Sequence, residues 1–120
     1  MALLSGALTA NAADWELYAQ GGDTAIFVAT DRITRNGDYV ETWQKDVSTK
    51  ARLVNKKSYA YAISQITVYC NPAGFAMRIH SITYYSKSGQ SVDAVSGEGP
   101  WKSLVPDSIG EGMAMRVCRQ

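Results

Sequence analysis

The amino-acid sequence predicts an α+β domain that is mainly β: an antiparallel meander of about six strands followed by one C-terminal helix. Most of the chain consists of short segments in which apolar and polar residues alternate, separated by turns that contain glycine, asparagine or proline. Near the end of the chain, apolar residues recur instead at every fourth position, which is the spacing of a helix. The length of 120 residues fits one domain rather than several.

The first three predicted strands are separated by turns. Residues 15–20 form the first strand and precede Gly21-Gly22-Asp23. Residues 24–30 form the second, in which Ile26 and Val28 occupy alternate positions on one face. Residues 39–44 form the third, directly after Asn36-Gly37, a dipeptide suited to the positive φ angles of tight turns.

The fourth and fifth predicted strands are the longest. In residues 59–70, one face carries Ile66, Val68 and Cys70, and the other carries Gln65, Thr67 and Tyr69. The fifth strand begins after a turn at residues 71–74. Its apolar face carries Phe75, Met77 and Ile79, and its other face carries Arg78 and His80. A polar turn follows, and residues 91–95 form the sixth strand.

A short helix is predicted to begin after Ser108. Ser108 and Glu111 have the spacing of a capping box, in which each side chain satisfies a free backbone amide of the other residue. The apolar stripe of this helix comprises Ile109, Met113 and Val117. Two glycines within it lower its intrinsic stability, so the helix requires tertiary anchoring.

Residues 1–12 have features of a truncated export signal. They carry no charge, and Ala10-Asn11-Ala12 fits the small-x-small pattern read by signal peptidases. Cleavage before Ala13 leaves a single domain over residues 13–120; a disordered terminus is the alternative interpretation. No other run has the length that a membrane-spanning helix needs, so we expect an exported protein without a transmembrane segment.

Export bears on the two cysteines. In an oxidising compartment, Cys70 and Cys118 are the one possible intramolecular pair, although two unrelated buried thiols are the alternative. A disulfide between them would attach the last turn of the helix to the apolar face of the fourth strand.

The order and spacing of three blocks resemble the bacterial surface-adhesin protein E family. The first block is residues 31–40 with Trp43, and the second is Cys70 with residues 78–81 and 83–85. The third block comprises Pro100-Trp101, residues 106–111 and Val117-Cys118. The resemblance covers essentially the whole chain from Trp15 onward.

The resemblance implies a curved antiparallel sheet whose concave face holds the C-terminal helix, clamped there by the disulfide. It also implies a small, exported, non-enzymatic protein of a Gram-negative bacterium, located in the periplasm, at the cell surface or secreted. The name-giving member of the family is a surface lipoprotein that binds host matrix and plasma proteins. In this chain Ala13, not cysteine, follows the expected cleavage site, so we expect no lipid anchor.

The overall charge is nearly balanced, with 12 Lys and Arg against 11 Asp and Glu. This balance gives no general attraction for nucleic acid, and we expect no nucleic-acid partner. One segment departs from it, opposed in sequence only by Asp46. Its cations are Lys45, Lys50, Arg52, Lys56 and Lys57. The segment is either a docking site for an acidic protein segment or a sulfated glycan, or a solvated loop between the third and fourth strands.

Tyrosines are concentrated on the two long strands. They are Tyr59, Tyr61, Tyr69, Tyr84 and Tyr85. Tyrosine offers a large contact area with a polar tip, which favours a partner-binding or self-associating face, and a homodimer is one expectation. Tyrosine is also a good strand former, so simple filling of the strands is the alternative.

Catalysis is not expected. His80 is the only histidine, shares its predicted face with Arg78, Ile82 and Tyr84, and has no acidic residue near it in sequence. A metal or haem site needs further ligands, and two cysteines are too few for an iron–sulfur cluster. No serine lies in a nucleophile-elbow motif, so we expect no cofactor, no metal and no enzymatic activity.

The sequence therefore indicates two classes of function. The first is an exported binding module that contacts a host or envelope macromolecule, as the adhesin resemblance implies. The second is a periplasmic regulator of an enzyme, such as an inhibitor of a cell-wall hydrolase.

Overall fold

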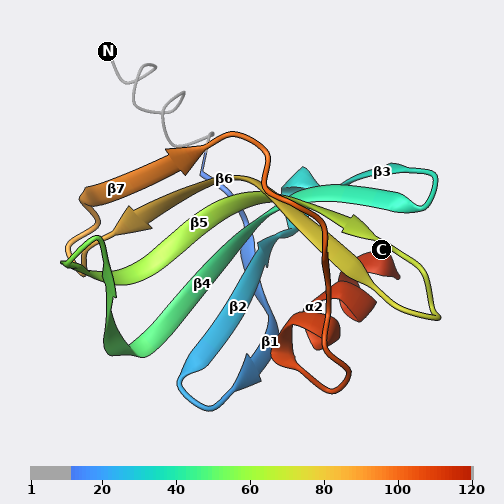
Figure 1. Ribbon diagram of the computed structural model, residues 1–120, viewed down its shortest axis with the longest axis horizontal. Helices are drawn as coiled ribbons and strands as arrows, with labels where there is room; N and C mark the ends of the chain where they lie inside the picture. The colour runs from blue at the N-terminus through green and yellow to red at the C-terminus, as the bar shows by residue number, and fades with distance from the viewer. Residues whose placement is uncertain (1–11, 120) are drawn as a thin grey trace, which may run out of the picture.

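The computed structural model describes residues 12–119 and shows one open antiparallel sheet with a single α-helix. The expected export signal lies outside these residues, apart from its last position. Figure 1 shows that the sheet curves around the C-terminal helix, so that one face is concave and the other convex. The predicted mainly-β fold class is therefore confirmed.

The sheet is a meander with two short additional strands. Its main strands are β1 (Trp15–Gly21), β2 (Thr24–Ala29), β4 (Tyr39–Val54), β5 (Lys57–Tyr69), β6 (Ala76–Tyr85) and β7 (Ser91–Ser96), hydrogen-bonded in this order. A 3₁₀ turn, η1 (Thr30–Arg32), follows β2. The short strands β3 (Thr34–Asn36) and β8 (Lys102–Ser103) pair with β4 and β6. Neither short strand was predicted, because strands of two or three residues are too short to show an alternation of apolar and polar positions.

The hairpin of β4 and β5 is longer than predicted. β4 continues from Gln44 to Val54, and β5 already begins at Lys57. Asn55 and Lys56 connect the two strands with φ angles of 48° and 66°, the left-handed conformation of a tight hairpin turn. The interpretation of this region as a loop is therefore wrong: most of it is strand. Its apolar residues, Val47, Ala51, Leu53 and Val54, are interspersed with charged and polar ones, so the alternation that identifies a strand is weak.

The helix α2 (Ile109–Cys118) covers one end of the concave face, where it packs against β1 and β5. Met113, Ala114 and Val117 are fully buried. The strand residues of this core are Tyr18, Ile26, Val28, Val40, Ile66 and Val68. Removing these apolar side chains from water is the main stabilisation of the domain.

The start of α2 confirms the capping role of Ser108. Its Oγ accepts a hydrogen bond from the Glu111 backbone amide at 3.1 Å. The second half of the box differs, since Glu111 Oε1 accepts from the amide of Asp107, at 2.9 Å, instead of from that of Ser108. Asp107 has a φ of 64°, which presents its amide to the carboxylate.

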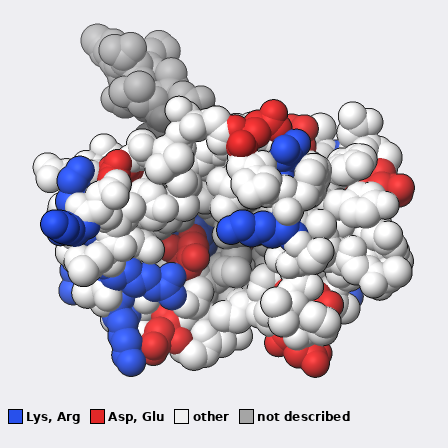
Figure 2. Space-filling model, viewed as in Figure 1, with Lys and Arg blue, Asp and Glu red and all other residues white. Residues whose placement is uncertain are grey.

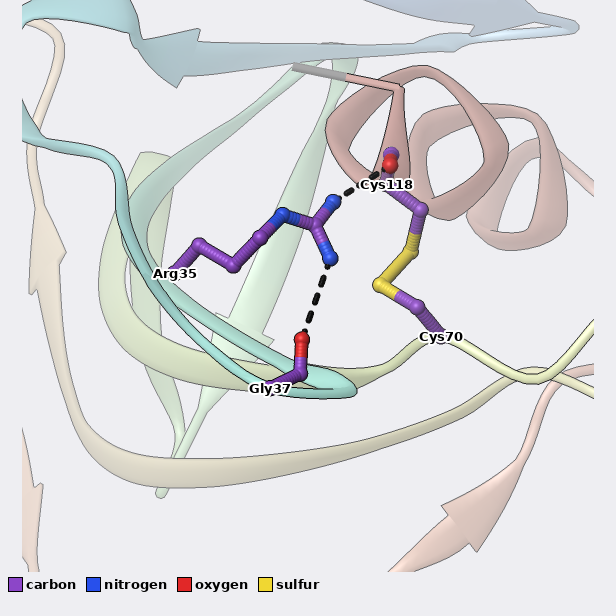
Figure 3. The surroundings of a disulfide bond; sticks show 4 residues. All are labelled: Arg35, Gly37, Cys70 and Cys118. Atoms are coloured by element: carbon purple, nitrogen blue, oxygen red, sulfur yellow. Dashed lines mark hydrogen bonds between the residues drawn. A yellow bond between two sulfur atoms is a disulfide. The ribbon is translucent and has the colours of Figure 1, made fainter.

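A disulfide joins Cys70 to Cys118, with their Cα atoms 5.7 Å apart, as predicted. Cys70 directly follows β5, and Cys118 is the last residue of α2. Figure 3 shows Arg35, from β3, beside this bond. Its guanidinium donates to the carbonyl oxygens of Gly37 and Cys118. The bond and Arg35 therefore hold the end of the helix against both β5 and the β3–β4 turn.

Replacing both cysteines with serine is expected to destabilise the domain by about 4 kcal/mol, because the disulfide closes a loop with a sequence separation of 48 residues. Urea unfolding of the wild type and the Cys70→Ser/Cys118→Ser variant measures this loss. Reductant should lower the urea midpoint of the wild type and leave that of the variant unchanged. Equal midpoints for the oxidised wild type and the variant would contradict the anchoring role.

The variant Ser108→Ala should lose about 1 kcal/mol of stability, since the amide of Glu111 loses its acceptor. Ser103→Ala, at an exposed position in β8, is the matched control and should change stability by less than about 0.5 kcal/mol. Thermal melts of both variants measure these changes. A similar loss of stability in the two variants would show that the Ser108 cap contributes nothing specific.

Candidate partner-binding surface

The convex face of the sheet is the side on which exposed aromatic residues gather. Within residues 12–119, α2 is the only α-helix, and it lies on the concave face. Side chains alternate along a strand, so the buried Val40 and Val68 point toward α2, and Tyr39 and Tyr69 point to the convex side. These two tyrosines are direct partners on β4 and β5.

Tyr39, Tyr69 and Trp101 form a contiguous group, here named the aromatic cluster. The ring centroids of Tyr39 and Tyr69 are 5.2 Å apart, and those of Tyr39 and Trp101 are 5.8 Å apart. Tyr39 is 46% exposed and Trp101 is 41% exposed. From the sequence, Tyr69 was predicted as a candidate site residue, but Tyr39 and Trp101 were not. Trp101 lies in the connection between β7 and β8, and only the fold brings it to β4 and β5.

Arg78 fixes the position of Trp101. Its guanidinium carbon lies 5.1 Å from the centroid of the Trp101 ring. The same side chain donates from Nε to the carbonyl oxygen of Gly99 at 3.1 Å, and Nη1 lies 3.2 Å from Glu98 Oε1. Three contacts thus attach the connection after β7 to β6, and the aromatic cluster has a fixed base.

His80 belongs to the same supporting network. Its Nε2 lies 2.6 Å from the buried Thr67 hydroxyl, and its Nδ1 lies 3.5 Å from Glu98 Oε1. No acidic residue is near His80 in sequence, and the fold supplies Glu98 from the segment after β7. Because one carboxylate contacts both His80 and Arg78, the arrangement is typical of a structural polar network.

A β-bulge changes the face on which half of β6 lies. Gln65 pairs with Ser81 and Ile66 pairs with Ile79, so His80 is the extra residue. Beyond the bulge, Ile82 and Tyr84 lie opposite Ser64 and Ala62 and point to the concave side. The predicted shared face of His80 is therefore right for Arg78 and wrong for Ile82 and Tyr84.

The other tyrosines divide between the two faces. Tyr61 and Tyr85 are cross-strand partners whose rings stack, with centroids 5.0 Å apart. Tyr59 and Tyr84 meet edge to face, with centroids 4.8 Å apart. Tyr84 is on the concave side, so the tyrosines of the two long strands do not make one surface.

The five cations of the basic segment are not gathered in one patch. Lys45 lies in the middle of the sheet, with Nζ 5.5 Å from the centroid of Trp15 and 5.2 Å from that of Tyr61. The other four, Lys50, Arg52, Lys56 and Lys57, belong to the outer half of the β4–β5 hairpin. Figure 2 shows Lys and Arg side chains at this end of the molecule, with single acidic groups between them.

Three of these four cations pair with acidic residues, two of which, Asp23 and Asp93, are distant in sequence. Lys50 Nζ lies 3.5 Å from Asp23, Arg52 Nη1 lies 4.0 Å from Asp46, and Lys57 Nζ lies 3.9 Å from Asp93. The Asp93 carboxylate also accepts from Asn55, and this hydrogen bond is the main reason that its pKa is lowered. The hairpin therefore carries a smaller excess of positive charge than the sequence of the segment alone indicates.

Asp46 is the one carboxylate of this region that is unfavourably placed. Burial raises the pKa of Asp46 above its usual range, and Arg52 opposes this effect only in part. Its Oδ1 and the neighbouring Gln44 Oε1 are buried without a hydrogen-bond partner among the described residues. Ionised Asp46 consequently lowers the stability of the fold.

This placement predicts a pH dependence. Because the folded-state pKa of Asp46 is raised, its contribution favours folding at low pH and is lost as pH rises through that pKa. Asp46→Asn should therefore gain stability relative to the wild type between pH 3 and pH 7, as thermal melts measure. Arg52→Gln removes the opposing cation, so its stability should fall more steeply over the same interval. A constant difference between Asp46→Asn and wild type would contradict this assignment.

Within residues 12–119, no three His, Cys, Asp or Glu side chains are grouped so that they could hold a metal ion. No helix of this part of the chain is long and apolar enough to span a membrane.

Comparison with known proteins adds the family. The family model described as surface-adhesin protein E matches residues 15–119. Neither the comparison with curated proteins nor that with solved structures gives a match. The matched region includes the whole sheet, the disulfide and α2, and it covers the three blocks that resemble this family. The chain belongs to the surface-adhesin protein E family.

Proposed function

We propose that this protein is an exported, non-enzymatic binding module that contacts a protein partner of a host through the aromatic cluster. Membership of the surface-adhesin protein E family supports an adhesin-like role. The observation that carries the proposal is the exposed pair Tyr39 and Trp101 on a sheet face that α2 does not cover.

The composition of the cluster suits recognition of protein. Tryptophan, tyrosine and arginine dominate the residues that carry most of the energy in protein interfaces. Here Tyr39, Tyr69 and Trp101 provide the contact area, and Arg78 lies against the Trp101 ring. The contacts of Arg78 with Glu98 and Gly99 already restrain the side chain of Arg78 and the segment that carries Trp101. Little conformational entropy is therefore lost when a partner docks.

The proposed location is the cell surface or the space outside the cytoplasm. The family supports it, and so does the disulfide, because such bonds persist in oxidising compartments. The expected cleavage before Ala13, the absence of a lipid anchor and a homodimer remain predictions.

Capture of host proteins tests the proposal. Immobilised wild type is exposed in parallel to serum and matrix proteins and to bacterial envelope extract, and the bound proteins are identified. For a captured host protein, Trp101→Ala should weaken affinity about tenfold or more. Arg78→Gln should weaken it less, because the ring remains but is held less firmly. Leu53→Ala, at a position that is 72% exposed and lies on the β4–β5 hairpin, is the control and should bind like wild type.

Three results would contradict the proposal: full affinity of Trp101→Ala, equal loss in Leu53→Ala, or enrichment of envelope proteins alone. Enrichment of a cell-wall hydrolase that the protein inhibits would favour the regulator instead. Thermal melts establish that each variant is folded. Sedimentation velocity of wild type and Trp101→Ala shows whether a homodimer buries the cluster and competes with the partner.

A further inference from the structure

A long break in the β4–β5 ladder builds a pocket at the end of the sheet away from α2. Val47 pairs with Tyr61, and the next pair along the hairpin is Arg52 with Tyr59. Residues 48–51 of β4 therefore face the single residue Ala60, and the ladder opens. The turn between β6 and β7 approaches from the other side, with Ser86 and Lys87. The pocket is partly open to solvent, and its volume is about 310 Å³.

The residues that line the pocket include several with hydroxyl groups and two lysines. Its lining residues are Ser48, Thr49, Lys50, Ala51, Ser58, Tyr59, Ala60, Ser86 and Lys87. None of them is acidic. Tyr59 is held in place by its edge-to-face contact with Tyr84. A ligand in this space would therefore meet positive charge, several groups that both donate and accept hydrogen bonds, and one aromatic ring.

The cations at this pocket are available to a ligand. The side chain of Lys50 is 77% exposed, and its ion pair with Asp23 is solvent-exposed and correspondingly weak. Lys87 makes no ion pair among the described residues. Lys56 and Lys57 lie at the turn of the same hairpin, so further positive charge borders this end of the sheet.

We infer that this pocket binds an anionic sugar unit of a sulfated glycan. Lys50 and Lys87 would pair with the sulfate group, and the serine and threonine hydroxyls would exchange hydrogen bonds with the hydroxyls of the sugar. The volume lies at the lower end of the range for small-molecule sites, which suits a short segment of such a chain. The site uses only two lining cations, of which Lys87 is outside the basic segment that the sequence indicates.

The inference does not depend on the aromatic cluster. The cluster includes the start of β4 and the end of β5, whereas the pocket lies beside the opposite ends of these strands. A sulfated glycan and a protein partner would thus occupy separate sites, and failure of one proposal leaves the other intact.

Titration with a heparin-derived tetrasaccharide tests the site. Calorimetry should show binding by the wild type that weakens as salt is raised, since the attraction is between exposed charges. Lys50→Gln/Lys87→Gln should weaken binding about tenfold, from the loss of two exposed ion pairs. Lys102→Gln, at an exposed position in β8, is the matched control and should bind like wild type. Amide NMR shifts should concentrate at Ser48, Thr49, Ser58 and Ser86.

The desulfated tetrasaccharide and a poly-glutamate peptide complete the experiment. The inference requires that both bind at least tenfold more weakly than the sulfated sugar. It is overturned by absence of binding in the wild type, by equal affinity for the peptide, by equal loss in Lys102→Gln, or by shifts that lie elsewhere. Trp101→Ala should bind the tetrasaccharide like wild type, which separates this site from the proposed protein-binding surface.

Discussion

The anchoring of α2 is the constraint on which the rest of the structure depends. The concave face needs a cover for Val28, Val40, Ile66 and Val68, and α2 supplies Met113 and Val117. A helix of ten residues with two glycines has little stability of its own. The disulfide, the Ser108 cap and the bond from Arg35 to Cys118 hold it in place. In the last turn of α2, Arg116 lies over the Tyr18 ring and donates to the carbonyl oxygen of Leu17.

Because one face of the sheet and one end of that face carry the core, the other regions can serve recognition. The aromatic cluster lies on the convex face, beside strand ends whose opposite sides pack toward α2. The pocket lies at the far end, where the β4–β5 hairpin extends beyond the core. Both positions are rigidly connected to the same strands, so the protein can present two surfaces in a fixed relation without a second domain.

Much of the fold could be predicted because its signals are local. The alternation in β5, the Asn36-Gly37 turn and the Ser108 cap each depend on a few neighbouring residues, and the two cysteines leave one pairing. The candidate surfaces could not be predicted in the same way. Glu98 and Trp101 reach Arg78 only through the path of the chain after β7, and Asp23 and Asp93 reach the hairpin from other strands. The hairpin itself shows only weak alternation of apolar and polar residues, because no core lies beneath its outer half.

The bulge at His80 makes a single strand serve both faces. Before it, β6 directs Met77 and Ile79 to the concave side; after it, residues of the opposite parity, Ile82 and Tyr84, take that role. The extra residue thus shifts the alternation of β6 by one position. Arg78 and His80 point to the convex side, as Thr67 does. Loss of this one residue would leave the first half of β6 unchanged but exchange inside and outside along the second half. The number of residues at this point of β6 is therefore as strongly constrained as the identity of its side chains. A relative that lacks one residue here would have a different convex surface and a different set of core residues in the second half of β6.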